Sequence, residues 1–169
     1  MKLLLGAGQD RWPGWMTLDA DPNSGADVIA SIPPLPDVVT AQTWEAVAMI
    51  HFIEHLYLWE ARALLRECHA ILQPGGALIL EQPDITYCAR VLLGQVTPPV
   101  GEPGQFDLWG LYGNPNDQNP WYGHHWGYTP SSLTAEVRAA GFATIGIYPA
   151  QFHHPERDFR LEARKAEVK

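Results

Sequence analysis

The sequence predicts an α/β fold in which helices pack on a mainly parallel sheet. Two continuous apolar runs, Ala46–Ile50 and Ala77–Leu80, lack the alternation of a half-exposed strand and are typical of strands buried on both faces. Between them, apolar residues recur three and four positions apart from about Trp59 to Leu72, which predicts an amphipathic helix that ends at a Gln-Pro-Gly-Gly turn. Strands that alternate with helices in this way form parallel sheets.

Shorter elements extend this pattern to a full sheet. The other strands are expected at Lys2–Leu5, Thr17–Leu18, Ala26–Ala30, Thr144–Tyr148 and Phe159–Arg164. Further helices are expected at Ile85–Leu93 and after Thr129, which would cap a helix that has Pro130 at its first position and stops at Gly141. Residues 6–14, between the first two strands, are too few for a crossover helix. The length suits one domain over residues 1–169.

Composition excludes several classes of protein. With 46% hydrophobic and 18% charged residues, the chain is expected to be globular. The net charge of −8 provides no basic stripe for phosphates, so no nucleic-acid partner is expected. No apolar run approaches the ~18 residues of a membrane span. The two cysteines, Cys68 and Cys88, lie in predicted helices, which argues against disulfides and indicates a reducing, cytoplasmic location.

A long segment, residues 94–127, has no helical or strand periodicity and is rich in glycine, proline, asparagine and aromatic residues. We expect it to form a lid over the pocket that binds the substrate. Aromatic faces stack on sugar rings and flat ligands, and no lysine or arginine lies between Arg90 and Arg138, so a small-molecule or glycan-like acceptor is expected. The alternative is that the rings only attach the loop to the body. The aromatic residues concerned are Phe106, Trp109, Tyr112, Trp121, Tyr122 and Trp126.

Several motifs occur in a characteristic order along the chain. Leu3–Gly8 is a strand that runs into a Gly-x-Gly turn, and Asp19 ends the next strand. The fragments "MIHFIEHL", "LRECHAILQPGGALILEQPD" and "GHHWGYTPSSLTAEVRAAGF" follow. Together these motifs resemble the class I S-adenosylmethionine (SAM)-dependent methyltransferases. The resemblance implies a Rossmann-like, seven-stranded, mostly parallel sheet with an antiparallel C-terminal hairpin. A short bacterial subgroup, often linked to cell-surface polysaccharide genes, shares the reduced or absent first crossover helix.

The resemblance implies SAM as the cofactor. The residues expected to hold it are Gly6, Ala7, Gly8, Asp19, Ser31, Ile32 and His51. Gly6 and Gly8 allow the backbone to approach a ligand closely. A carboxylate at the carboxyl end of a strand, such as Asp19, can accept hydrogen bonds from ribose hydroxyls. Ser31 stands where members of the family usually carry an acid, so it would bond the adenine only weakly while Ile32 packs on the ring.

Three histidines are candidate bases, because imidazole titrates near neutral pH. His124 and His125 precede the helix that should border the cofactor, and His51 follows a buried strand. Each could instead be a loop or core histidine that hydrogen-bonds the backbone. The run His51-x-x-Glu54-His55 also has the composition of a metal site. A metal-free site is the favoured interpretation, so no metal ligand is assigned, and a divalent ion stays as the alternative.

These observations predict a methyltransferase that transfers a methyl group from SAM to a hydroxyl group of a small-molecule or glycan-like acceptor. The alternative belongs to another class of protein: a catalytically inactive, methyltransferase-like module that binds a ligand or a partner. The short first crossover and Ser31 favour this alternative, whereas the grouped histidines favour the enzyme.

Overall fold

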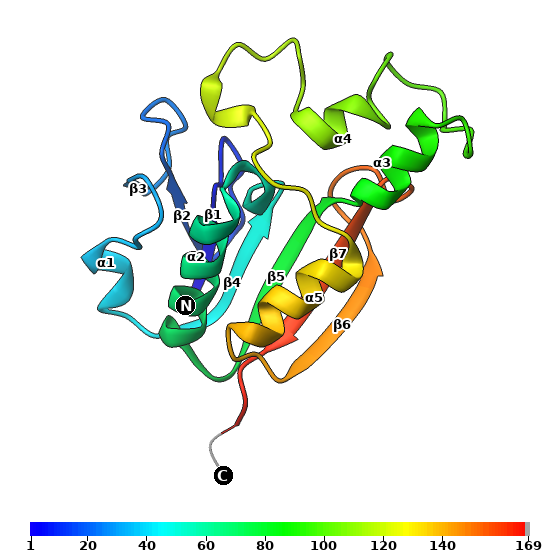
Figure 1. The fold of residues 1–169 in the computed structure, drawn as a ribbon. Coiled ribbons are helices and arrows are strands. Elements are labelled where there is room, and N and C mark those ends of the chain that lie inside the picture. The colour runs from blue at the N-terminus through cyan, green and yellow to red at the C-terminus, as the bar shows by residue number, and fades with distance from the viewer. Residues whose placement is uncertain (168–169) are drawn as a thin grey trace.

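The computed structural model describes residues 1–167. Its centre is a seven-stranded sheet with the order β3-β2-β1-β4-β5-β7-β6 (Figure 1). The strands are β1 (Lys2–Leu5), β2 (Trp15–Asp19), β3 (Val28–Ile29), β4 (Trp44–Ile50), β5 (Leu72–Pro83), β6 (Thr144–Pro149) and β7 (Asp158–Arg164). The first five pair with one another in parallel, and β7 is antiparallel to both β5 and β6. The predicted mostly parallel sheet with an antiparallel C-terminal hairpin is confirmed.

The longer helices agree with the periodicity of the sequence. The helical elements are α1 (Asp37–Thr40), η1 (Ile53–His55), α2 (Leu58–Ile71), α3 (Ile85–Leu92), α4 (Leu108–Tyr112), η2 (Pro120–Tyr122) and α5 (Pro130–Ala139). Thr129 caps α5 as predicted, since its side chain accepts a hydrogen bond from the Ser132 backbone. The four shortest elements were not predicted, because three to five residues are too few to show a period. Among the described residues, no helix combines the length and apolar character of a membrane span.

The turn after α2 differs from the prediction. Residues 73–76 were expected to separate the helix from a strand, but β5 already begins at Leu72. Trp44 pairs with Leu72 and Ala46 pairs with Ala77, so β5 has four residues where β4 has one. The extra residues form a bulge, in which Gly75 adopts the left-handed conformation (φ +73°). Strand pairing on either side therefore absorbs the turn into the sheet.

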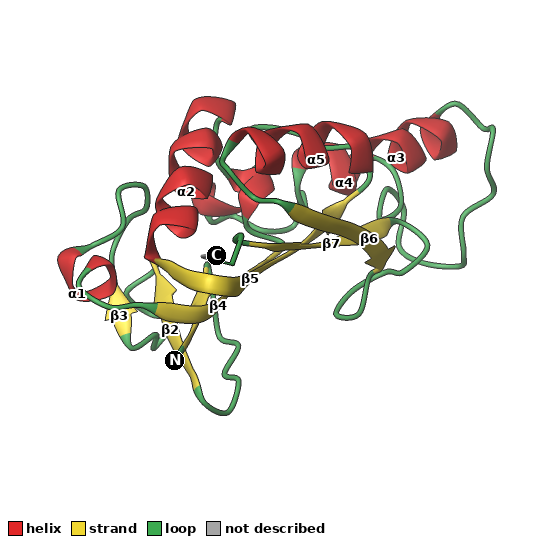
Figure 2. Cartoon of the chain, turned by 90° about the horizontal axis from the view of Figure 1, so that it is seen from below, coloured by secondary structure: helices red, strands yellow, loops and turns green. Residues whose placement is uncertain are grey.

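The longer helices all lie on one side of the sheet. Figure 2 shows α2, α3, α4 and α5 together above it, and no described helix below. The main core fills the space between: Leu64 and Leu65 of α2 and Leu133 and Val137 of α5 are fully buried against the sheet. The opposite face is helix-free because short loops connect β1 to β2 and β2 to β3. There Leu4, Ala7, Ala48 and Ile50 form a small cluster, against which Trp12, Trp15 and Ile79 pack.

The sheet brings the predicted site residues to one edge. In the parallel register, Leu5 of β1 pairs with Leu18 of β2 and with Met49 of β4, so these three strands end at the same level. Gly6, Asp19 and His51 therefore lie at neighbouring strand ends. In open α/β sheets this carboxyl edge is where ligands bind.

Candidate functional site

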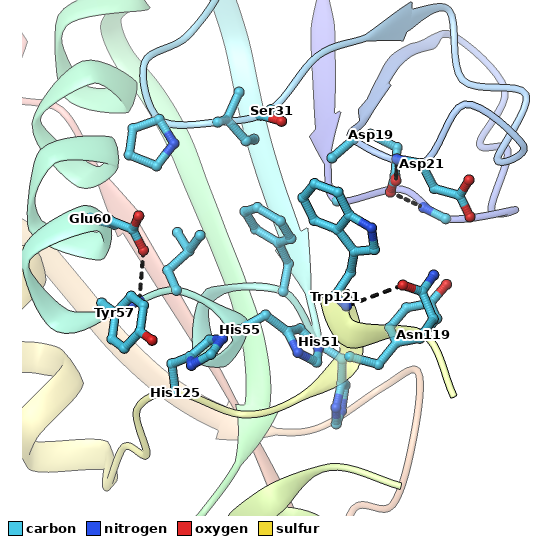
Figure 3. A pocket seen from close by; sticks show the side chains of 18 residues that line it. Asp19, Asp21, Ser31, His51, His55, Tyr57, Glu60, Asn119, Trp121 and His125 are labelled. Carbon is cyan, nitrogen blue, oxygen red and sulfur yellow. Dashed lines mark hydrogen bonds between the residues drawn. The ribbon is translucent and has the colours of Figure 1, made fainter. Parts of the chain in front are cut away.

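A cavity of about 330 Å³ opens at the carboxyl edge of β1, β2 and β4 (Figure 3). We call it the edge cavity. Of the predicted site residues, it brings together Gly6, Gly8, Asp19, Ser31, Ile32, His51 and His125. Its volume lies in the range of pockets for small molecules and cofactors, about 300–1,000 Å³.

Two predicted residues do not line the cavity. The side chain of Ala7 is only 4% exposed and packs in the cluster on the helix-free face, because the turn after β1 directs it to the opposite side of the sheet from the cavity. His124 lies behind the wall of the cavity, beside Glu54 and His55. The side chains of these two residues therefore lie apart from the other predicted site residues, which line the cavity.

The turn that follows β1 requires glycine at its first position. Gly6 has a φ of +62°, and a Cβ atom there would overlap the ring of Phe52. Gly8 has a φ of +51°, but no atom lies within 4 Å of the position of its missing Cβ. The two glycines thus have different roles, since Gly6 allows Phe52 to pack and Gly8 leaves open space beside the cavity.

Asp19, at the end of β2, is held by the backbone. Its Oδ2 accepts a hydrogen bond from the Gly8 N–H at 2.7 Å, and its Oδ1 accepts one from the Asp21 N–H at 2.8 Å. A carboxylate oxygen has two lone pairs, so each oxygen keeps one for a ligand in the cavity. The result is a fixed pair of acceptors, side by side, of the kind that a vicinal diol requires.

His51 is held between two buried carboxylates. Its Nε2 lies 3.0 Å from Oδ2 of Asp158, and its Nδ1 lies 3.3 Å from Oε1 of Glu54. The His51 backbone also adopts a φ of +48°, in a region that a residue with a side chain rarely occupies. Such conformations persist only where the surrounding structure enforces them, and they gather at functional sites.

These contacts set the charge of His51. Burial alone would lower the pKa of His51, but its contacts with the Asp158 and Glu54 carboxylates outweigh burial and raise this pKa to about 9. Burial opposes ionisation of Glu54, yet the interaction with His51 lowers the pKa of Glu54 to about 2. His51 is therefore an imidazolium at neutral pH. Because both ring nitrogens face carboxylates, the structure argues against the prediction that His51 is a base.

The two late histidines point to different places. The His124 Nδ1 lies 3.1 Å from the carbonyl oxygen of Gly110, and its ring centre lies 4.9 Å from that of His55. Burial lowers the pKa of His124. His125 instead lines the edge cavity, where its ring centre lies 4.3 Å from that of Tyr57. The chain bends at His125, and these two sequence neighbours lie in different surroundings.

The long segment supplies part of the cavity wall. In Figure 1 this segment, green to yellow, runs over the carboxyl edge of the sheet. Trp121 and Tyr122 of η2, with Asn119, line the cavity, and Figure 3 shows the Trp121 indole extending into it. Phe106 behaves differently, since it is buried at 5% exposure beneath the segment. Trp121 and Tyr122 therefore belong to the wall of the cavity, whereas Phe106 is part of the packed interior.

Sequence reasoning missed several residues that line the cavity. Phe52, Leu56 and Tyr57 follow β4, and Trp121 and Tyr122 come from the distant segment. The first three could have been included, because they directly follow a predicted strand whose end lies at the ligand edge. The last two had no local pattern that indicated their position.

The strand order and the cavity define a class I SAM-dependent methyltransferase fold, as the motifs predicted. The family described as "Methyltransferase domain" matches residues 8–146, which is most of the chain. This protein therefore belongs to that methyltransferase family. A comparison with curated protein sequences finds no match.

Solved structures share the fold at low sequence identity. A SAM-dependent methyltransferase from Archaeoglobus fulgidus is 14% identical, with a TM-score of 0.64 over 97% of this chain and 85% of that one. A possible histamine N-methyltransferase from Thermotoga maritima is 16% identical, with a TM-score of 0.62 over 97% and 81%. The N-methyltransferase NodS from Bradyrhizobium japonicum, solved with S-adenosylhomocysteine, is 13% identical, with a TM-score of 0.60 over 98% and 78%.

Proposed function

We propose that this protein transfers a methyl group from SAM to a hydroxyl group of a small-molecule or glycan-like acceptor. The observation that carries the proposal is the edge cavity, where the Asp19 carboxylate, the Gly6–Gly8 turn and the charged His51 surround one space. SAM is a nucleoside joined to an amino acid. A site for it needs hydrogen-bond acceptors for the ribose hydroxyls, a backbone turn that allows close approach, and a cation for the carboxylate.

The side chains of the cavity suit SAM. The free lone pairs of Asp19 can accept both ribose hydroxyls. Ile32 offers an apolar surface for the adenine, and Ser31 is a short polar neighbour. The positive charge of His51 would attract the carboxylate of the methionine part. When bound, SAM supplies a methyl group on a positively charged sulfur atom.

His125 is the residue that we propose as the proton acceptor. It lines the cavity and is exposed, and no hydrogen bond engages its ring among the described residues. A neutral imidazole in this position can accept the proton of an acceptor hydroxyl. His124 is less suited because it lies outside the cavity, and His51 is less suited because it is already protonated.

The rim of the cavity near His125 suits a flat or ring-shaped acceptor. Tyr57 lines the cavity and stacks on Trp59, with ring centres 4.5 Å apart and an angle of 6° between the planes. Trp59 is 66% exposed, so this aromatic pair continues from the cavity to the surface. Sugar rings and flat ligands bind aromatic faces of this kind.

The test combines cofactor binding with methyl transfer. We expect calorimetry to detect SAM and S-adenosylhomocysteine, and labelled SAM to methylate members of a panel of sugars and aromatic alcohols, with the product's methyl position found by NMR. His125→Ala should lower turnover about 100-fold or more, while His69→Ala, on α2 away from the cavity, should not. Methylation of nitrogen alone would refute the hydroxyl acceptor. Binding of SAM without turnover on any acceptor would favour the inactive module.

A further inference from the structure

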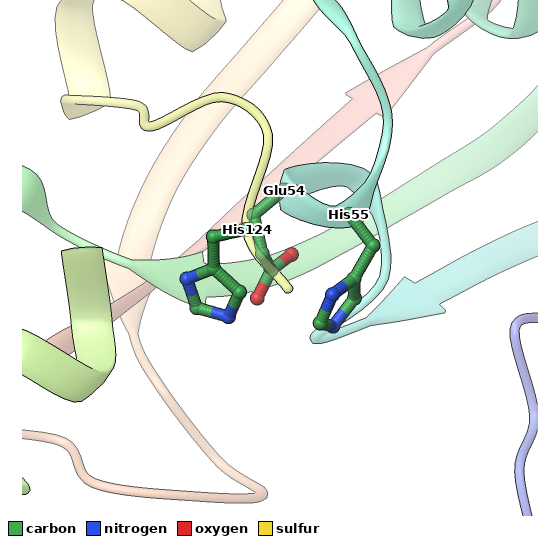
Figure 4. A group of neighbouring side chains, drawn as sticks. All are labelled: Glu54, His55 and His124. Atoms are coloured by element: carbon green, nitrogen blue, oxygen red, sulfur yellow. The ribbon is translucent and has the colours of Figure 1, made fainter. Parts of the chain in front are cut away.

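A second group of side chains lies at the margin of the edge cavity. Glu54 and His55 come from η1, and His124 comes from the end of the long segment. Each offers one ligand atom, and these atoms all lie within 4.8 Å of one another. Figure 4 shows the Glu54 carboxylate between the two imidazole rings. Residues 70 positions apart in the sequence thus converge on one point.

The Glu54 carboxylate is buried without a hydrogen bond. The side chain is 2% exposed, and neither oxygen accepts a hydrogen bond from the residues that the structure describes. His51 lies 3.3 Å from one oxygen, in a contact of charges that does not have hydrogen-bond geometry. Leaving a buried carboxylate without such bonds is costly, so a native structure usually supplies a partner. His51 balances the charge of Glu54 without a hydrogen bond. A cation between Glu54 and the two histidines would bind the carboxylate oxygens directly.

Both histidines are held in the form that binds metal ions. The His55 Nδ1 lies 3.2 Å from the carbonyl oxygen of Gly123, and the His124 Nδ1 lies 3.1 Å from the carbonyl oxygen of Gly110. A carbonyl oxygen only accepts hydrogen bonds, so each Nδ1 carries the proton and each Nε2 keeps its lone pair. Histidines that ligate metals typically donate their other ring N–H to a carbonyl or carboxylate in this way.

We propose that Glu54, His55 and His124 bind a divalent transition-metal ion, for which Zn²⁺ is the natural choice. Two imidazoles and one carboxylate form a known zinc ligand set and leave one coordination position open. His55 also lines the edge cavity, so the ion would lie at the margin of that cavity. This inference concerns a binding site and does not depend on methyl transfer.

The experiment measures metal binding directly. Protein prepared without a metal-affinity tag is dialysed against a chelator and titrated with Zn²⁺ in competition with a chromophoric chelator. We expect one equivalent to bind. Loss of a residue that only hydrogen-bonds a metal ligand weakens metal binding by about 10–100-fold. His124→Ala removes a ligand itself, so it should weaken Zn²⁺ binding by more than that. His125→Ala is the matched control, because this neighbouring histidine lies outside the cluster, and it should bind Zn²⁺ as the unmodified chain does.

Two further measurements test the site if His124→Ala folds poorly. Glu54→Gln keeps the shape of the side chain and should also lose the ion, and Co²⁺ bound to the unmodified chain should give the visible absorption of a site with nitrogen and oxygen ligands. Absence of Zn²⁺ binding and of Co²⁺ bands would overturn the proposal, and Glu54 would then serve only as the counter-ion of His51. Equal affinity in the His124 and His125 variants would also overturn it. SAM calorimetry on the same samples tests the cofactor proposal separately.

Discussion

The imidazole of His51 lies 3.0 Å from the carboxylate of Asp158, a residue 107 positions later in the chain. His51 follows β4 and Asp158 begins β7, with β5 between these two strands. Arg157 holds the same carboxylate, with its Nε 2.6 Å from Oδ1 and its Nη2 3.0 Å from Oδ2. Asp158 therefore joins the ligand edge of the parallel strands to the antiparallel hairpin.

The first prediction concerns this carboxylate. Asp158 is fully buried as a side chain, so Asp158→Asn removes the negative charge that His51 and Arg157 share. Breaking a buried pair costs about 3–5 kcal/mol, and we expect a loss of that order in the free energy of unfolding, measured with urea at pH 7. Val38→Ala, a truncation at an exposed position of α1, is the control and should change stability little. A loss no larger than the control's would contradict the prediction.

The stabilisation by Asp158 should also depend on pH, which a comparison of the unmodified chain with Asp158→Asn can measure. Although burial opposes it, the bonds from His51 and Arg157 lower the pKa of Asp158. A carboxylate whose pKa is lowered by folding stabilises the fold above its unfolded pKa, about 3.9, and loses this contribution as the pH falls further. Below the range in which His51 titrates, the stability difference between the unmodified chain and Asp158→Asn should therefore shrink as the pH falls below about 4. A difference that grows in acid would contradict this account.

Asp19→Ala tests the cofactor site. Loss of a hydrogen bond to a charged group costs about 1.5–3 kcal/mol, so we expect SAM affinity by calorimetry to fall by about ten-fold or more. Asp27→Ala is the matched control: it removes a carboxylate bonded to Thr17 of the same strand, β2, but outside the cavity. Equal loss in both variants would mean that β2 has been disturbed, and unchanged affinity in Asp19→Ala would remove the ribose assignment.

Gly6 and Gly8 give a paired prediction about the turn after β1. Both have positive φ, which disfavours alanine by about 1–2 kcal/mol. At Gly6 the new Cβ would also overlap the ring of Phe52, whereas at Gly8 it would meet open space. Gly6→Ala should therefore lower the free energy of unfolding clearly more than Gly8→Ala, as measured with urea. Equal losses would show that Phe52 moves without cost.

The last prediction concerns the segment over the edge cavity. We expect residues 113–122 to exchange amide hydrogens rapidly in the free protein and more slowly when SAM is bound, because Trp121 and Tyr122 line the cavity. Residues 104–112 should be protected in both states, since Phe106 and Gly110 are buried and Arg157 bonds the Gln105 carbonyl. Protection of both parts that does not change with ligand would show a fixed wall instead of a lid.

Local patterns were enough to predict most elements of the fold. The apolar runs predicted β4 and the centre of β5, and the order of Thr129, Pro130 and Gly141 predicted both ends of α5. These signals lie within a few neighbouring residues, where periodicity, caps and glycine conformation act directly. The same is true of the Gly-x-Gly turn and of Asp19, whose position follows from being at the end of a strand.

The sequence by itself therefore determined the strands, the main helices, the methyltransferase motifs and the edge at which a ligand would bind. Only the tertiary structure decided that His51 is paired with Asp158, that His124 joins Glu54 while His125 faces the cavity, and that Trp121 reaches the site. Each of these depends on which distant strands and loops become neighbours. Local periodicity carries no information about that, because long-range contacts arise from packing of the whole sheet and not from adjacent residues.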